Sequence, residues 1–217
     1  MTLSKGILGH GKELYEFIYE NNLKCNIRPA FLVDNVNDNF GMTNEEYFEF
    51  FKEIFELWIN DEKIKLTQIR EIYEEFAKAL NSKYCVSNCS VSGNCFTNFI
   101  SLDFDGNLYS CNRTYNNNKF YYGNINEITT DELEIKMQKI LEQRKKYILN
   151  SKCKKCELYK ECNGGCPANA YSKNGTLLSA DDYFCDAKKK IKKYINKYLD
   201  ENGLRNQYNN YIREKNV

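Results

Sequence analysis

Apolar side chains recur first at helical and then at strand-like spacing near the start of the chain. The stretch GKELYEFIYENN (11–22) predicts a helix that places Leu14, Phe17 and Ile18 on one face. The stretch that follows, LKCNIRPAFLV (23–33), is apolar enough for a strand. A helix followed directly by a strand is the order found in proteins built from βα units.

Three more elements are predicted before residue 84. Thr43 and Glu46 form a capping-box pattern that opens a long helix. A strand, KIKLTQI (63–69), and a helix, REIYEEFAKAL (70–80), follow it. Three helices and two strands are too few to close a βα barrel. The apolar stripe of the long helix has the spacing of a buried face, which favours core packing over an aromatic ligand box, and consists of Tyr47, Phe48, Phe51, Ile54, Phe55 and Trp58.

The pattern changes from residue 85 onward. Two short strand-like runs flank Asp105 and Gly106, a pair typical of a β-hairpin turn. Thr129 and Glu132 repeat the capping box and open a helix that continues to about residue 150. A last helix is predicted in the stretch DAKKKIKKYINKYLDENG (186–203), with its lysines on a solvated face. The apolar stripe of that helix consists of Ala187, Ile191, Tyr194, Ile195 and Tyr198.

Charge and composition exclude several classes of protein. Of the 217 residues, 31 are Lys or Arg and 30 are Asp or Glu, so the net charge of +1 provides no basic surface for nucleic acid. No stretch reaches the ~18 consecutive apolar residues of a membrane span, and the first residues lack the apolar segment of a signal peptide. We therefore expect a cytoplasmic protein. Ten cysteines, about 4.6% of the chain, are fewer than the roughly 8–10% of a disulfide scaffold, which favours metal or redox chemistry.

A run of four cysteines between Cys153 and Cys166 has the spacing C-x2-C-x5-C-x3-C. A zinc ribbon usually has two C-x2-C knuckles, and the only histidine, His10, is predicted to be a surface residue far from the run. The ending C-x3-C-P resembles that of bacterial ferredoxins, in which the cysteine before the proline binds the other of two clusters. Gly164 and Gly165 permit the left-handed turns that would aim the last two thiols in different directions.

Ten cysteines suffice for two four-thiol sites. If Cys166 belongs to a second site, Cys153, Cys156 and Cys162 need a fourth ligand, for which Cys185 is the nearest candidate. Three partners for Cys166 would then come from the upstream cysteines, which leaves a choice among Cys85, Cys89, Cys95 and Cys111.

Order and spacing of these residues resemble the seven-cysteine signature of SPASM domains. Those domains are C-terminal extensions of radical S-adenosylmethionine (SAM) enzymes that mature peptides and proteins. The stretch YYGNINE also resembles the family's Leu-Gly-Asn-Ile step. The residues that match the signature are Cys95, Gly106, Cys111, Cys153, Cys156, Cys162, Cys166 and Cys185.

The anaerobic sulfatase-maturase branch of the family has an eighth cysteine six positions before the first, where this chain has Cys89. Cys85 is the alternative to Cys89, and Cys25 is predicted to be a packed core thiol. The resemblance implies two auxiliary [4Fe–4S] clusters. The ligands implied for the first are Cys89, Cys95, Cys111 and Cys166, and those implied for the second are Cys153, Cys156, Cys162 and Cys185.

Two departures from the family limit what the resemblance implies. Radical SAM enzymes bind their catalytic cluster through C-x3-C-x2-C, whereas Cys85 and Cys89 are followed by Ser92 at the third position. We therefore do not expect the chain to cleave SAM alone, and its status as an enzyme stays open. SAM would bind only to a missing N-terminal core, so the chain is expected to be a fragment or to work with a partner. Asn112 stands where sulfatase maturases have an aspartate base, which favours a small ribosomal peptide as substrate over a sulfatase.

The expected fold is α+β, with the last βα units of a partial TIM barrel over 1–84, a SPASM domain over 85–190, and a C-terminal helix and tail over 191–217. The expected function is the iron–sulfur-binding portion of a radical SAM enzyme that modifies a peptide or protein. The expected partners are that substrate and either the missing radical SAM core or an electron donor, without nucleic acid or membrane. Two alternatives are a zinc-binding interaction module and a ferredoxin-like electron carrier.

Overall fold

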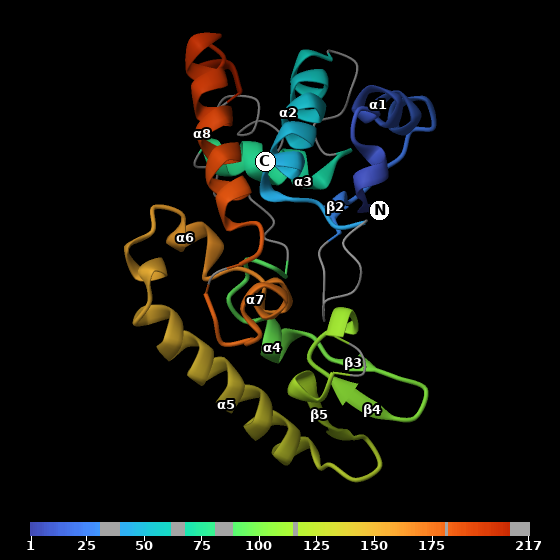
Figure 1. Cartoon of the computed structure of the whole chain (residues 1–217), viewed down its shortest axis with the longest axis vertical. Helices are drawn as coiled ribbons and strands as arrows, with labels where there is room; N and C mark the ends of the chain where they lie inside the picture. Colours follow the sequence, from blue (N-terminus) through green and yellow to red (C-terminus); the bar gives the residue numbers. More distant parts are fainter. Residues whose placement is uncertain (31–39, 62–67, 81–88, 115–116, 181, 209–217) are drawn as a thin grey trace. The chain divides into compact units, whose positions relative to one another are not determined.

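A computed structural model of the chain describes residues 1–30, 40–61, 68–80, 89–114, 117–180 and 182–208 (Figure 1). The chain divides into two compact units. The first contains the described residues up to 80 together with those from 184 onward, and the second contains the described residues from 89 to 183. Helices predominate and the sheets are small, so the expected mixture of α and β structure is confirmed.

The first unit begins with a small parallel sheet. Strand β1 (Thr2–Leu3) pairs with β2 (Arg28–Pro29), and the 3-10 helix η1 (Lys5–Ile7) and helix α1 (Gly11–Glu20) lie between them in the chain. Of the strand predicted over 23–33, the described part pairs only at β2 and at an isolated bridge of Cys25 with Ile69. Residues 62–67 lie outside the described residues, so the strand predicted over 63–69 stays a prediction.

The buried face of α1 differs from the prediction at one residue. Leu14 and Ile18 are buried as predicted, but Phe17 is 53% exposed. Tyr15 is buried in its place. Each helical residue advances by about 100°, so Phe17 lies about 200° from Tyr15 and points away from the face that contacts the rest of the unit.

Three helices form the apolar core of this unit: α2 (Asn44–Asn60), α3 (Arg70–Ala79) and α8 (Cys185–Glu201). The capping box predicted for α2 is present. The predicted stripe of α2 is buried except at Phe48, which is half-buried, while Phe50 is buried instead. Along α8 the tyrosines of the stripe are half-buried and Leu199 joins the buried face. Rings of Trp58 and Phe76 meet edge to face, with their centroids 5.2 Å apart.

The second unit contains a three-stranded antiparallel sheet in the order β3-β4-β5, formed by β3 (Ser101–Leu102), β4 (Asn107–Tyr109) and β5 (Tyr121–Asn124). The hairpin predicted at Asp105 and Gly106 joins β3 to β4, and Gly106 has a φ of +84°. Helix α5 (Thr130–Leu149) begins at the predicted capping box and packs on the sheet through a cluster of Leu108, Tyr122 and Met137.

Short helices occupy the rest of the second unit. The segment that carries the cysteine run contains a 3-10 helix, η4 (Lys152–Lys155), and α6 (Tyr159–Cys162). Proline at the first position opens α7 (Pro167–Asn174), because the missing N–H of proline costs nothing there. The others are α4 (Cys95–Asn98) and the 3-10 helices η2 (Asn112–Thr114) and η3 (Asn118–Phe120). Among the described residues, no helix has both the length and the apolar character needed to cross a membrane.

Candidate iron–sulfur site

Four thiols from well-separated parts of the sequence come together in the second unit. The Cys95 thiol interacts electrostatically with those of Cys166, Cys89 and Cys111, and the Cys111 thiol with those of Cys166 and Cys89. Burial, followed by these neighbours, raises the pKa of Cys95 to about 12. Burial also raises the pKa of Cys111. Neighbouring thiolates in a partly buried site repel one another, so a bound cationic group would be needed to keep them ionised together.

Short elements position three of these thiols. Cys95 is the first residue of α4, Cys111 lies between β4 and η2, and Cys166 is the N-cap of α7. Cys166 is buried, and the other three are half-buried. Four thiols on separate segments are a donor set that suits an iron–sulfur cluster or zinc. Among the described residues, no group of three or more His, Cys, Asp or Glu side chains is arranged to hold a single metal ion.

Glycines shape the segment that carries Cys166. Gly164 and Gly165 have φ values of +84° and +72°, the left-handed turns that the sequence predicted. A Cβ atom on Gly165 would lie 2.6 Å from Oδ2 of Asp182. Asn163 is also left-handed, and its Nδ2 donates to the carbonyl of Val91 over 2.8 Å. This bond joins the segment that ends at Cys166 to the segment between Cys89 and Cys95.

A buried arginine donates hydrogen bonds to the backbone of the glycine pair. Arg144 of α5 is 4% exposed, and its Nη2 donates to the carbonyls of Gly164 over 2.8 Å and Gly165 over 3.1 Å. Its Nη1 donates to the carbonyl of Ser179 over 2.6 Å and to that of Leu177. Burial lowers the pKa of Arg144, an effect opposed by the thiols and the nearby acid; arginine nevertheless stays protonated in proteins. The site therefore contains a fixed positive charge.

A second arginine contacts a candidate ligand directly. Nη1 of Arg113 lies 3.6 Å from Sγ of Cys166, and its Nη2 donates to Oδ1 of Asn169 over 2.8 Å. Nδ2 of Asn169 donates to Oδ1 of Asp182 over 3.1 Å, and Oδ2 of Asp182 accepts from the backbone N–H of Cys166 over 2.8 Å. Asn169 and Asp182 are both buried. These contacts form a closed polar ring of Cys166, Arg113, Asn169 and Asp182, which we call the ring around Cys166.

Comparison with curated proteins identifies relatives of the chain. The chain is 24% identical over 193 residues to a cysteine-type anaerobic sulfatase-maturating enzyme of Clostridium perfringens (strain 13 / Type A), which covers 85% of this chain and 50% of the relative. It is 24% identical over 163 residues to a serine-type anaerobic sulfatase-maturating enzyme of Bacteroides thetaiotaomicron, which covers 75% of this chain and 38% of the relative. Its homologues are anaerobic sulfatase-maturating enzymes. No protein-family model matches the chain.

Solved structures share the fold of this chain. The structure of native anSMEcpe with bound AdoMet superposes with a TM-score of 0.68 at 23% identity and covers 94% of this chain and 55% of that one. The structure of native anSMEcpe with bound AdoMet and Cp18Cys peptide gives the same TM-score and identity, with 95% and 57% covered. The chain thus spans about half the length of the curated maturases it matches.

The other four cysteines of the maturase-like signature belong to different units. Cys153, Cys156 and Cys162 lie in the second unit, where Cys153 is buried and its Sγ donates to the carbonyl of Ala180 over 3.2 Å. Cys185 is the first residue of α8 in the other unit, so this second set stays a prediction.

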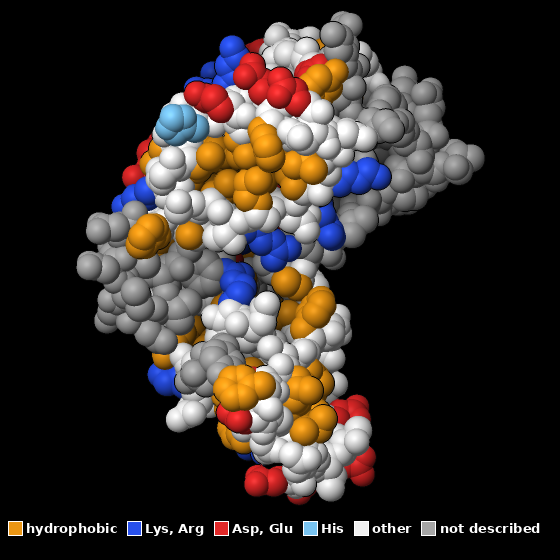
Figure 2. Space-filling view, turned by 90° about the vertical axis from the view of Figure 1, so that its right-hand side faces the viewer, with side chains coloured by type: hydrophobic (Ala, Val, Ile, Leu, Met, Phe, Trp, Pro, Cys, Tyr) orange, Lys and Arg blue, Asp and Glu red, His pale blue; other side chains and the backbone are white. Residues whose placement is uncertain are grey.

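Cys25, Cys85 and Asn112 belong to neither set of thiols. Cys85 lies outside the described residues. Cys25 is half-buried, and burial raises its pKa. Asn112, at the position of the maturase aspartate, is exposed, and its Oδ1 accepts from Sγ of Cys111 over 3.7 Å. Figure 2 shows the only histidine, His10, at the surface, as predicted.

Sequence reasoning missed the polar residues around the thiols. The sequence did contain a sign that Arg144 is buried. Arg144 lies on the buried stripe of α5, whose other members, Met137, Leu141 and Ile148, are apolar. A charged residue on such a stripe is buried only when its partners satisfy it. No pattern in the sequence singles out Arg113, whose partner Asn169 is 56 residues away.

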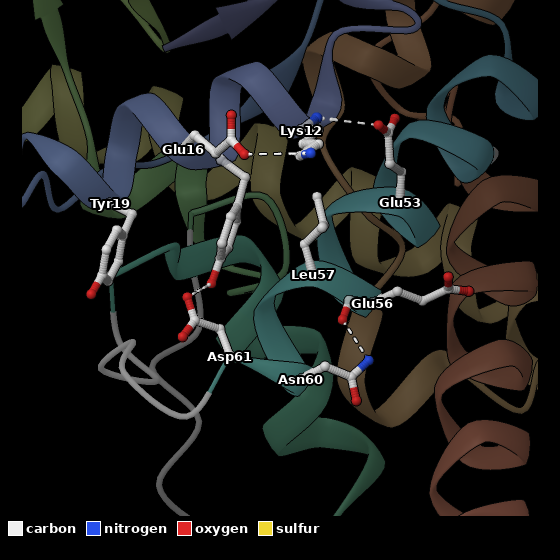
Figure 3. Close-up of a pocket in the computed structure, with 9 residues that line it drawn as sticks. Lys12, Glu16, Tyr19, Glu53, Glu56, Leu57, Asn60 and Asp61 are labelled. Atoms are coloured by element: carbon white, nitrogen blue, oxygen red, sulfur yellow. Dashed lines mark hydrogen bonds and ion pairs between the residues drawn. The ribbon is translucent and has the colours of Figure 1, made fainter.

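A separate groove of about 800 Å³ lies along α1 and α2 in the first unit (Figure 3). Glu53 accepts from the backbone N–H of Lys12 over 3.2 Å, so close to Gly11 that a side chain there would clash. The hydroxyl of Tyr15 donates to Oδ2 of Asp61 over 2.9 Å, and burial raises the pKa of Tyr15. These contacts join the two helices. The groove is lined by Lys12, Tyr15, Glu16, Tyr19, Glu53, Glu56, Leu57, Asn60 and Asp61.

Proposed function

We propose that this chain is the auxiliary-cluster, or SPASM, portion of a radical SAM enzyme that modifies a peptide or protein. The observation that carries the proposal is the convergence of Cys89, Cys95, Cys111 and Cys166, the four cysteines implied for the first cluster. The homology to sulfatase maturases supports it independently. Residues 1–84 are the remnant of a partial βα barrel, 85–190 the SPASM domain and 191–217 its C-terminal helix and tail.

In this proposal the converging set holds one [4Fe–4S] cluster, and the other set holds a second through Cys153, Cys156, Cys162 and Cys185. Such clusters transfer electrons or bind substrate. The chain's own residues supply thiolates from separate segments, exclude water from Cys166 and place the Arg144 cation among the thiols. Cys89 is preferred to Cys85 because of its spacing, six positions before Cys95, and its interactions with Cys95 and Cys111 support it as a ligand. A cytoplasmic location belongs to the same proposal, since the thiols must stay reduced.

Cleavage of SAM lies outside the proposed role of this chain, because Ser92 interrupts C-x3-C-x2-C. A radical SAM core, on the same polypeptide or on a partner, would supply it. The substrate class is a peptide: a structural neighbour is anSMEcpe with bound Cp18Cys peptide, which supports this class. Asn112 has no carboxylate to remove a proton, so a small peptide is favoured over a sulfatase.

The test is anaerobic reconstitution of the full chain with iron and sulfide, followed by metal analysis and EPR of the dithionite-reduced protein. We expect about eight irons per chain, as two four-iron clusters require. The Cys95→Ala variant should lose about half of them, and Cys25→Ala, outside both sets, should lose none. Two zincs without iron would support the zinc-binding alternative instead, and a colourless, iron-poor wild-type chain would overturn the proposal.

A further inference from the structure

The ring around Cys166 is closed by four residues. Arg113 contacts Sγ of Cys166 over 3.6 Å and Asn169 over 2.8 Å. Asn169 contacts Asp182 over 3.1 Å, and Asp182 returns to the backbone N–H of Cys166 over 2.8 Å. The ring therefore fixes both the sulfur and the donor that faces it.

Burial makes this ring rigid and electrostatically effective. Cys166 is 6% exposed, Asn169 7% and Asp182 1%, while Arg113 is half-buried. Asp182 is the acceptor that orients the amide of Asn169, and that amide oxygen orients one arm of the guanidinium. Because the fork of an arginine is planar, fixing Nη2 also fixes the direction in which Nη1 points. A lysine has no second arm through which it could be held.

A donor held against a ligating sulfur changes the energetics of electron transfer. Hydrogen bonds to the sulfurs and the net charge nearby are among the factors that set the reduction potential of a cluster. Reduction adds one electron and therefore one negative charge, which a nearby guanidinium stabilises. The effect is strongest where water is excluded, as it is at Cys166.

We propose that Arg113 is a positioning residue that donates to Sγ of Cys166 and raises the reduction potential of the cluster bound there, with Asn169 and Asp182 holding it in place. The inference rests on the proposed function, since it requires the cluster. The step concerned is a one-electron reduction in which dithionite supplies the electron and no covalent bond forms or breaks.

The experiment is an EPR-monitored redox titration of the reconstituted full chain, with iron analysis of every sample. Arg113→Gln should keep about eight irons, as two four-iron clusters require. It should lower the equilibrium constant for reduction at least about tenfold, a shift of about 59 mV for one electron, in one of the two titration steps only.

Arg113→Lys and Asn169→Leu separate the contributions of charge and orientation. Both retain a positive charge at position 113 but lose the fixed donor, so each should lower the potential of the same step by a smaller amount. Lys119→Gln is the matched control. Lys119 donates to the carbonyl of Gly175 over 3.2 Å and lies over the ring of Tyr171, so its removal should leave both potentials unchanged.

The outcomes separate the two proposals. A wild-type chain without iron overturns the proposed function. A wild-type chain with iron whose potentials are unchanged in iron-loaded Arg113→Gln overturns this inference alone. If Arg113→Gln does not take up iron, the same titration of Asn169→Leu tests the inference. An unchanged reduction potential in iron-loaded Asn169→Leu then overturns the inference.

Discussion

Replacing Arg144 by methionine should destabilise the second unit severely. Methionine has about the right length and fills the space, but it leaves four carbonyls without their donor. Hydrogen bonds from a charged group contribute about 1.5–3 kcal/mol each. Each Nη atom is shared between two carbonyls, so we count two such bonds, which gives a loss of about 3–6 kcal/mol. That is a large part of the stability of an ordinary domain.

The assay is hydrogen exchange by mass spectrometry on the reduced, metal-free full chain. Tryptophan fluorescence would not report on this region directly, since the only tryptophan, Trp58, belongs to the first unit. A loss of 3 kcal/mol or more should speed exchange in peptides covering 164–179 by at least about 100-fold, because each 1.4 kcal/mol is a factor of ten. Lys145→Met is the matched control, an exposed neighbour on the same helix. Equal exchange in the two variants would refute the reasoning.

Four further substitutions test local features. Gly165→Ala puts a Cβ at a φ of +72° and against Asp182. It should therefore lower the free energy of unfolding in urea by more than about 1 kcal/mol and reduce iron uptake. An unchanged urea midpoint would contradict the geometry. Thr43→Ala and Thr129→Ala each remove a capping box and should each cost about 1 kcal/mol by the same assay; no loss would mean that the caps are not formed in solution. The backbone N–H of Thr129 donates to the Glu132 carboxylate and lowers its pKa. The charged carboxylate therefore stabilises the fold at pH values above the ordinary pKa of glutamate. This stabilisation is lost as the pH falls through the lowered pKa of the folded state. Glu132→Gln should therefore melt below the wild type at neutral pH and level with it in acid, and a constant difference would argue against this linkage.

Features encoded within a few residues were predictable from the sequence. Both capping boxes formed where Thr43 and Thr129 predicted them, because cap and partner are three residues apart. The Asp105-Gly106 turn is equally local. Burial of Phe17 was predicted wrongly, because helical periodicity defines a stripe without specifying which of its edges faces the rest of the protein.

Features that depend on distant partners were not predictable in the same way. The resemblance to maturases divided the cysteines into two sets, and the assignment of the sets stays a prediction. In the structure the thiols of Cys95 and Cys111 interact with those of Cys89 and Cys166. The residues that hold those thiols in place escaped notice. Arg144 stands in a run of charged residues that resembles a solvated helix face, and the apolar stripe of α5 was the one sign of its burial. Its partners lie 20 to 35 residues further along the chain.

The ring around Cys166 also determines when the site can be completed during synthesis. Asp182, which closes the ring, follows Cys89 by 93 residues along the chain. At about 5–20 residues per second, the ribosome needs roughly 5–19 seconds to cover that distance. Throughout this interval the first thiols emerge without their buried partners. The cell must therefore keep a nascent chain reduced for seconds before its cysteines can shelter one another.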